Sequence, residues 1–83
     1  MKRLRVFTIT VGAKCVGIID ASVTPERLRE LIGQVLEDEY GDCLESLIIT
    51  WKGKGDYAEI VTSFDSDPGA PNYFKLSNQK VYF

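Results

Sequence analysis

The sequence predicts a single α+β domain, residues 1–83, in which one α-helix packs on a mainly antiparallel sheet of four to six strands. Three observations support this fold class. One stretch has helical apolar spacing, several short stretches are rich in β-branched and aromatic residues, and 83 residues suffice for only one hydrophobic core. One helix on one sheet lets these elements bury their apolar faces, and the expected order is ββαββ followed by one or two short strands.

The helix is expected within Val23–Gly41. Thr24 can cap its first turn, and Pro25 suits the first helical position, where no backbone N–H is needed. Gly41 is suited to end the helix in a left-handed turn. The residues that repeat at helical spacing form one apolar stripe: Leu28, Leu31, Ile32, Val35 and Leu36.

Two strands are predicted before the helix, Arg3–Val11 and Lys14–Ala21. Gly12-Ala13 between them suits a two-residue hairpin turn of type II′, which needs glycine first. Apolar residues of the first strand fall in both alternating positions, which predicts a bulge or burial on both faces. Gly17 within the second strand indicates a bulge or the close approach of another element.

Two further strands are predicted after the helix. Leu44–Lys52 reads as a half-buried strand with Trp51 on its core side, and Tyr57–Phe64 follows a turn at residues 53–56. The order of hairpin, helix and strand resembles a β-grasp, the ubiquitin-type fold, over the first half of the chain. The resemblance implies an arrangement of elements only, because the chain lacks the Gly-Gly tail of conjugated modifiers and fold analogy says little about function.

The last third of the chain combines turn residues with aromatic residues. Asp65–Asn72, with two prolines and a glycine, predicts the longest loop. Beyond it, Tyr73–Leu76 and Lys80–Phe83 are expected as short strands about a turn at residues 77–79. A tail this aromatic is expected to pack against the domain or a neighbour.

The composition is that of a soluble globular domain, with 45% hydrophobic residues, 27% charged residues and a formal net charge of −2. No apolar run approaches the roughly 20 residues that a membrane span needs. Thr8 and Thr10 interrupt the apolar stretch near the N-terminus, so a signal peptide is not expected. These features predict a cytoplasmic protein without membrane contact.

Catalytic and metal-binding motifs are lacking from the sequence. Without histidine, a P-loop or a GxGxxG motif, the chain gives no support for catalysis, so a non-enzymatic protein is expected. Cys15 and Cys43 form no CxxC pair and have no histidine to complete a zinc site, so we expect no metal and no other cofactor. Both are expected to be small buried thiols, with a disulfide left open.

Charge is distributed unevenly along the chain. Residues 26–45 contain seven acidic residues against two arginines, whereas residues 1–14 contain four basic residues and no acidic one. Carboxylates in the last helical turn oppose the helix dipole, typically by about 0.3–1 kcal/mol each. The cluster therefore predicts either a solvated helix end or a surface that binds a basic protein partner, formed by Glu37, Asp38, Glu39, Asp42 and Glu45. Its spacing does not match a calcium loop.

A second interpretation is a nucleic-acid-binding module, because lysines beside aromatic residues can hold phosphates and stack bases. Its candidate residues are Arg3, Arg5, Lys52, Lys54 and Tyr57. The competing structural interpretation places Trp51 in the core and treats the lysines as ordinary solubilising residues. No RNA-binding motif of the RNP1 type is present.

A third interpretation is a structural subunit, and therefore a homo-oligomer, that assembles through strand edges. Arg3, Arg5 and Phe7 are expected on an exposed edge strand, where charges usually hinder such pairing. The leading expectation remains a small interaction or regulatory protein of the inhibitor or adaptor type, as phages and other mobile elements often encode.

Overall fold

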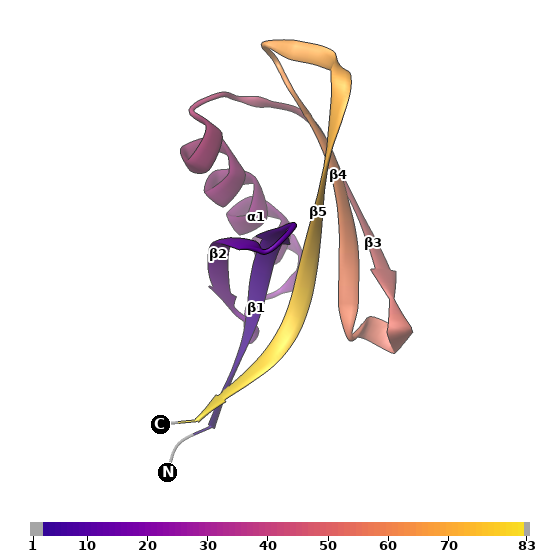
Figure 1. Cartoon of the computed structure of the whole chain (residues 1–83). Helices are drawn as coiled ribbons and strands as arrows, with labels where there is room; N and C mark the ends of the chain where they lie inside the picture. Colours follow the sequence, from indigo (N-terminus) through magenta and orange to yellow (C-terminus); the bar gives the residue numbers. More distant parts are fainter. Residues whose placement is uncertain (1–2, 83) are drawn as a thin grey trace.

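The computed structural model describes the backbone of residues 3–82 and the side chains of residues 4–80. One helix packs on a five-stranded antiparallel sheet in the order β2-β1-β5-β4-β3, which confirms the predicted α+β fold (Figure 1). The molecule is elongated, with extents of 45 × 26 × 25 Å. The elements, in chain order, are β1 (Arg3–Val11), β2 (Lys14–Asp20), α1 (Pro25–Tyr40), β3 (Leu44–Lys52), the 3-10 turn η1 (Gly53–Gly55), β4 (Tyr57–Phe64) and β5 (Asp67–Tyr82).

The boundaries of α1 are set by the capping residues that the sequence predicts. The Thr24 side chain accepts a hydrogen bond from the backbone N–H of Arg27 at 3.2 Å, and Pro25 opens the helix. Gly41 adopts a left-handed φ of 65°, and its N–H donates to the Glu37 carbonyl at 2.8 Å. Both ends are therefore fixed by local chemistry.

The core lies between α1 and one face of the sheet, and within residues 3–82 no helix covers the opposite face (Figure 1). Leu28, Ile32 and Leu36 point from the helix into this core. The sheet contributes fully buried side chains that include Ile9 and Ile60. Packing of the predicted stripe on the sheet explains why this short amphipathic helix is stable.

The β1–β2 hairpin turns at Gly12, with a φ of 59°, as the two-residue turn requires. A register shift after Ile9 supplies the bulge, and Val6 to Ile9 are all buried. A Cβ atom at Gly17 would collide with the Val35 side chain, so this glycine lets the helix approach β2 closely. The sequence prediction of a close contact at Gly17 is confirmed.

β1 is an interior strand, so the expected exposed edge at the start of the chain is wrong. β1 pairs with β2 on one side and β5 on the other, and Phe7 is buried. The outer strands are β2 and β3. The β1–β5 pair is antiparallel, as are the other strand pairs of the sheet.

The predicted loop and the two short terminal strands are wrong, because β5 is one continuous strand of 16 residues. The β4–β5 hairpin turns tightly at Asp65-Ser66. Pro68 and Pro71 are tolerated because neither has to donate to a neighbouring strand: pairing with β1 starts only at Lys75, and pairing with β4 passes from Asp67 directly to Asn72. The polar run at residues 77–79 pairs directly with β1, and this pairing overrides its turn propensity.

The two cysteines are free and exposed, which contradicts the prediction of buried thiols. Cys15 lies on the outer strand β2, and Cys43 lies in the connection between α1 and β3. Within residues 3–82, no helix is long and apolar enough to span a membrane.

Candidate functional site

The C-terminal end of α1 and the tip of the β4–β5 hairpin are joined by hydrogen bonds. The Asp65 N–H donates to the Cys43 carbonyl at 2.9 Å. The Asp42 carboxylate accepts from the Ser66 N–H at 3.2 Å and also from the Ser66 hydroxyl. These contacts link segments that are 24 residues apart and fix the hairpin beside the helix end (Figure 1).

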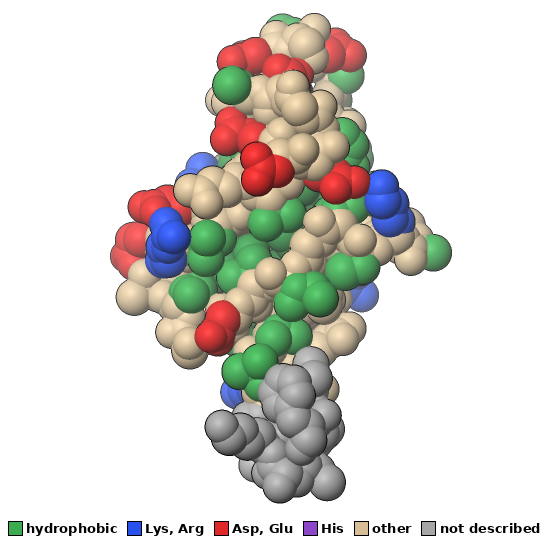
Figure 2. Space-filling model, turned by 90° about the vertical axis from the view of Figure 1, so that its left-hand side faces the viewer, with side chains coloured by type: hydrophobic (Ala, Val, Ile, Leu, Met, Phe, Trp, Pro, Cys, Tyr) green, Lys and Arg blue, Asp and Glu red, His purple; other side chains and the backbone are tan. Residues whose placement is uncertain are grey.

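This junction places seven carboxylates at one end of the molecule. Five are the predicted cluster, and two come from the hairpin; we call the set the acidic end: Glu37, Asp38, Glu39, Asp42, Glu45, Asp65 and Asp67. Figure 2 shows acidic side chains gathered over the upper part of the helix side of the molecule. The five predicted residues are thus neighbours in space.

Four of the acidic residues also have structural roles. Glu37 accepts the N–H of Leu44 at 2.9 Å, where β3 begins. Glu39 pairs with Lys14 at 2.9 Å, and Glu45 accepts from the Ser63 hydroxyl at 3.4 Å. Asp42 holds the hairpin as described above. These partners offset the unfavourable position of carboxylates at a helix C-terminus.

The remaining three carboxylates, Asp38, Asp65 and Asp67, are exposed. Within the described part of the chain, their side chains make no hydrogen bond or ion pair. They are therefore free to meet a partner without breaking internal contacts. Their position on two different elements gives the surface a fixed shape.

Hydrogen bonds shift the pKa values of two groups at this end, Asp42 and Lys14. The Ser66 hydroxyl lowers the pKa of Asp42 below its ordinary value of 3.8, which keeps the carboxylate charged. The Glu39 carboxylate raises the pKa of Lys14 above 10.5, first through their hydrogen bond and then through charge. Both groups are fully charged near neutral pH.

Tyr40 adds an aromatic surface to the acidic end. Its side chain is 46% exposed, and its ring lies 5.3 Å from that of Phe64 and 5.8 Å from that of Phe74. The two buried rings hold Tyr40 in place at the last helical residue. Rigid, half-exposed tyrosines are frequent anchors of protein interfaces.

The structure does not bring the predicted nucleic-acid patch together. Arg5 lies on β1, whereas Lys52 and Tyr57 lie on β3 and β4, on the far side of β5. The strand registers place Arg5 on the helix-covered face and Tyr57 on the open face. Lys54 lies in the η1 turn, and the side chain of Arg3 falls outside the described side chains.

A smaller basic and aromatic group remains on the open face. Lys52 pairs with Tyr57 across β3 and β4, and the Lys75 ammonium lies 4.9 Å above the Tyr57 ring. Tyr57, Lys75 and Tyr73, which is 67% exposed, border a depression of about 600 Å³ that Glu59 also lines.

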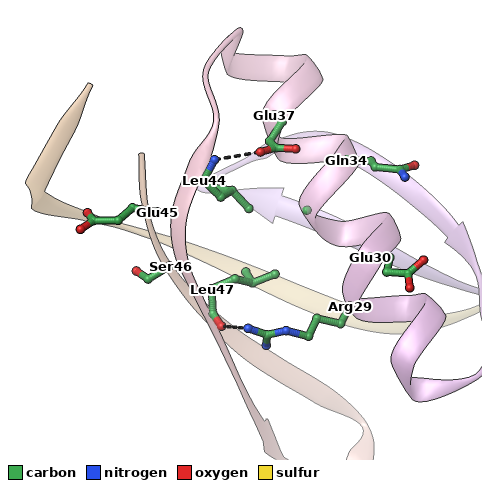
Figure 3. A pocket seen from close by; sticks show the side chains of 9 residues that line it. Arg29, Glu30, Gln34, Glu37, Leu44, Glu45, Ser46 and Leu47 are labelled. Carbon is green, nitrogen blue, oxygen red and sulfur yellow. Dashed lines mark hydrogen bonds between the residues drawn. The ribbon is translucent and has the colours of Figure 1, made fainter. Parts of the chain in front are cut away.

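A groove runs between α1 and the outer strand β3 (Figure 3). At the acidic end, a pocket of about 520 Å³ has Glu30, Glu37 and Glu45 in its wall. At the other end, a pocket of about 350 Å³ is lined by apolar residues that include Leu28 and Trp51, which is 45% exposed despite its core-facing position. Arg29 borders both pockets, so we call the whole feature the α1–β3 groove.

Arg29 crosses the groove from the helix to the strand. Its guanidinium donates a hydrogen bond to the backbone carbonyl of Leu47 at 2.6 Å, as Figure 3 shows. Arg29, Tyr40, Asp65 and Asp67 were not recognised as site residues from the sequence. Their roles depend on contacts between segments that are distant in the sequence. The sequence does give one signal, the two aspartates Asp65 and Asp67 in the predicted loop.

No family model, curated protein or solved structure matches this chain. Among residues 3–82, no group of three or more Asp, Glu, Cys or His side chains is arranged to hold a metal ion. Functional inference therefore depends on the acidic end and the groove themselves.

Proposed function

We propose that this chain is a small non-enzymatic protein of the inhibitor or adaptor type that binds a basic surface of a protein partner through its acidic end. The observation that supports this proposal is the joining of the helix end to the hairpin tip through Asp42 and Ser66. It brings seven carboxylates together on a rigid surface, beside an exposed tyrosine. Such charge complementarity speeds association and selects partners without any catalysis.

The arrangement of charge also favours a defined orientation of binding. The acidic end lies opposite the end that carries Lys54 and Arg5, along a molecule 45 Å long. A basic partner is therefore attracted mainly to the acidic end, because acidic and basic residues are mixed at the other end. The free thiols of Cys15 and Cys43 suit a reducing compartment, which supports our inference of a cytoplasmic location.

The test reverses charges that have no structural role. Glu37 and Asp42 are unsuitable because they accept backbone hydrogen bonds, so we choose Asp38→Lys with Asp65→Lys. The matched control is Glu26→Lys with Asp56→Lys at the other end. Each acid-to-lysine change raises the net charge by two units, so each double variant has a formal net charge of +2 instead of −2.

We expect the acidic-end variant to weaken partner capture from a host extract by about tenfold or more, because attraction becomes repulsion at the contact. The control variant should retain capture, and circular dichroism should show both variants folded. Equal capture by the two variants would refute the proposed surface.

A second candidate is a single-stranded nucleic-acid-binding module on the open face. The observation that favours it is the grouping of Lys52, Lys75, Tyr57 and Tyr73 on three neighbouring strands. Phosphate contacts make such binding fall steeply with salt. A titration with mixed single-stranded RNA and DNA at low salt tests it, and lack of binding there would exclude it.

A further inference from the structure

β3 is an outer strand whose free edge faces the groove. The Leu47 carbonyl points away from β4, because it accepts a hydrogen bond from the Arg29 guanidinium on the other side of the strand. Alternate residues of an antiparallel strand direct their backbone groups to the same side, so Ile49 and Trp51 also present N–H and C=O groups outward. An edge of this kind is a template for another strand.

Arg29 shields this edge in the free protein. Its guanidinium occupies the Leu47 carbonyl at 2.6 Å and divides the α1–β3 groove into its acidic and apolar halves. The bond is exposed and is made by a flexible side chain, so it can be exchanged for a backbone N–H from an incoming strand. Arg29 therefore protects the edge without closing it.

The groove walls define what an incoming segment should contain. The acidic half is lined by Glu30, Glu37 and Glu45 with Arg29, although Arg27 pairs with Glu30 at 3.0 Å and the Glu45 carboxylate turns away from α1 toward Ser63 (Figure 3). The apolar half ends at Trp51, which is only partly covered. Basic side chains suit the first half, and aliphatic or aromatic ones suit the second.

We propose that an extended segment of a partner protein, basic at one end and apolar at the other, adds to the outer edge of β3 as a sixth strand within the α1–β3 groove. Its backbone replaces Arg29 at the Leu47 carbonyl, and its alternate side chains face the helix. This inference rests on the proposed function, because the groove opens at the acidic end. It adds the form of the partner and the strand that receives it.

The probes are synthetic fluorescent nonapeptides of sequence TKTKTLTFT and its reverse, which cover both strand directions. Control peptides carry Glu in place of Lys. Two further versions are N-methylated on the backbone. One carries the methyl groups at the Thr residues, and the other carries them at the Lys, Leu and Phe residues. In an added strand these two sets of N–H groups point to opposite sides, so only one set faces β3.

Fluorescence anisotropy should show binding of a Lys peptide and none of the Glu peptides. One N-methylated set should abolish binding, and the other should preserve it. Arg29→Ala should tighten binding by about two- to tenfold, because the peptide no longer competes for the Leu47 carbonyl. Arg27→Ala, which makes the same charge change on the same helix, should leave the affinity within about twofold of the original protein.

Three results would overturn strand addition: no binding of either Lys peptide, equal effects of both N-methylated sets, or weaker binding by Arg29→Ala. Concentration-dependent dimerisation of Arg29→Ala by light scattering, without peptide binding, would assign the edge to a second copy instead. If these tests fail while charge reversal at Asp38 and Asp65 still abolishes capture, the proposed function stands without the groove. If charge reversal has no effect either, both proposals fail.

Discussion

The contact between Gly17 and α1 offers a direct test of how the helix lies on the sheet. Gly17→Ala would place a methyl group against Val35, a branched side chain that cannot easily move aside. Overpacking of this kind costs about 1–3 kcal/mol. The reduced freedom of the unfolded chain offsets about 0.4–1 kcal/mol of this cost. We expect a net loss of about 1–2 kcal/mol, which lowers Tm by about 5–15 °C for a domain of this size.

Urea and thermal unfolding followed by circular dichroism would measure this loss. Gly69→Ala is the matched control, because a Cβ atom there meets nothing within 4 Å and should leave stability unchanged or slightly raised. Adding Val35→Ala to Gly17→Ala should remove the collision, with a coupling energy of about 1 kcal/mol or more. If Gly17→Ala is as stable as the original protein, the close approach of α1 to β2 is refuted.

Two further predictions concern protonation and thiol access. Because the folded pKa of Asp42 lies below its ordinary 3.8, its stabilising bonds to Ser66 are complete above that pH and are lost as the pH falls through the folded value. The Ser66 N–H should therefore lose protection from solvent exchange only as the pH falls below 3.8, and Ser66→Ala should reduce this pH dependence; protection that stays constant over the whole acid range in which the protein is folded would contradict this. Cys15 and Cys43 should both react with Ellman's reagent in the folded protein, whereas reaction only after addition of urea would show that they are buried.

Much of the fold is predictable because the signals are local. Thr24, Pro25 and Gly41 determine the ends of α1 through contacts within a few residues. The bounds of β5 could not be found in this way. Pro68 marks a loop by propensity, but it lies at an irregularity of the strand, between the paired residues Asp67 and Asn72, where no donor is required. Such exceptions depend on which strands become neighbours, and the sequence does not show this directly.

The candidate site is predictable only in part for the same reason. The acids near the end of α1 are conspicuous because they oppose the helix dipole. Their partners are not, since Asp42 bonds to Ser66 across 24 residues and Glu37 bonds to the start of the next strand. These long-range hydrogen bonds explain why acidic residues are tolerated at the C-terminal end of α1. They also bring Asp65 to the same surface. Arg29 gave no sequence signal, because its role depends on the carbonyl of an outer strand.

Recognition through charge at the acidic end is the central claim, and paired capture from the native host tests it most directly. Bound protein is quantified by mass spectrometry for the original chain, for Asp38→Lys with Asp65→Lys, and for Glu26→Lys with Asp56→Lys. The account predicts that a specific partner is lost only from the first double variant. Retention of that partner by the acidic-end variant, at the level of the control, would contradict it.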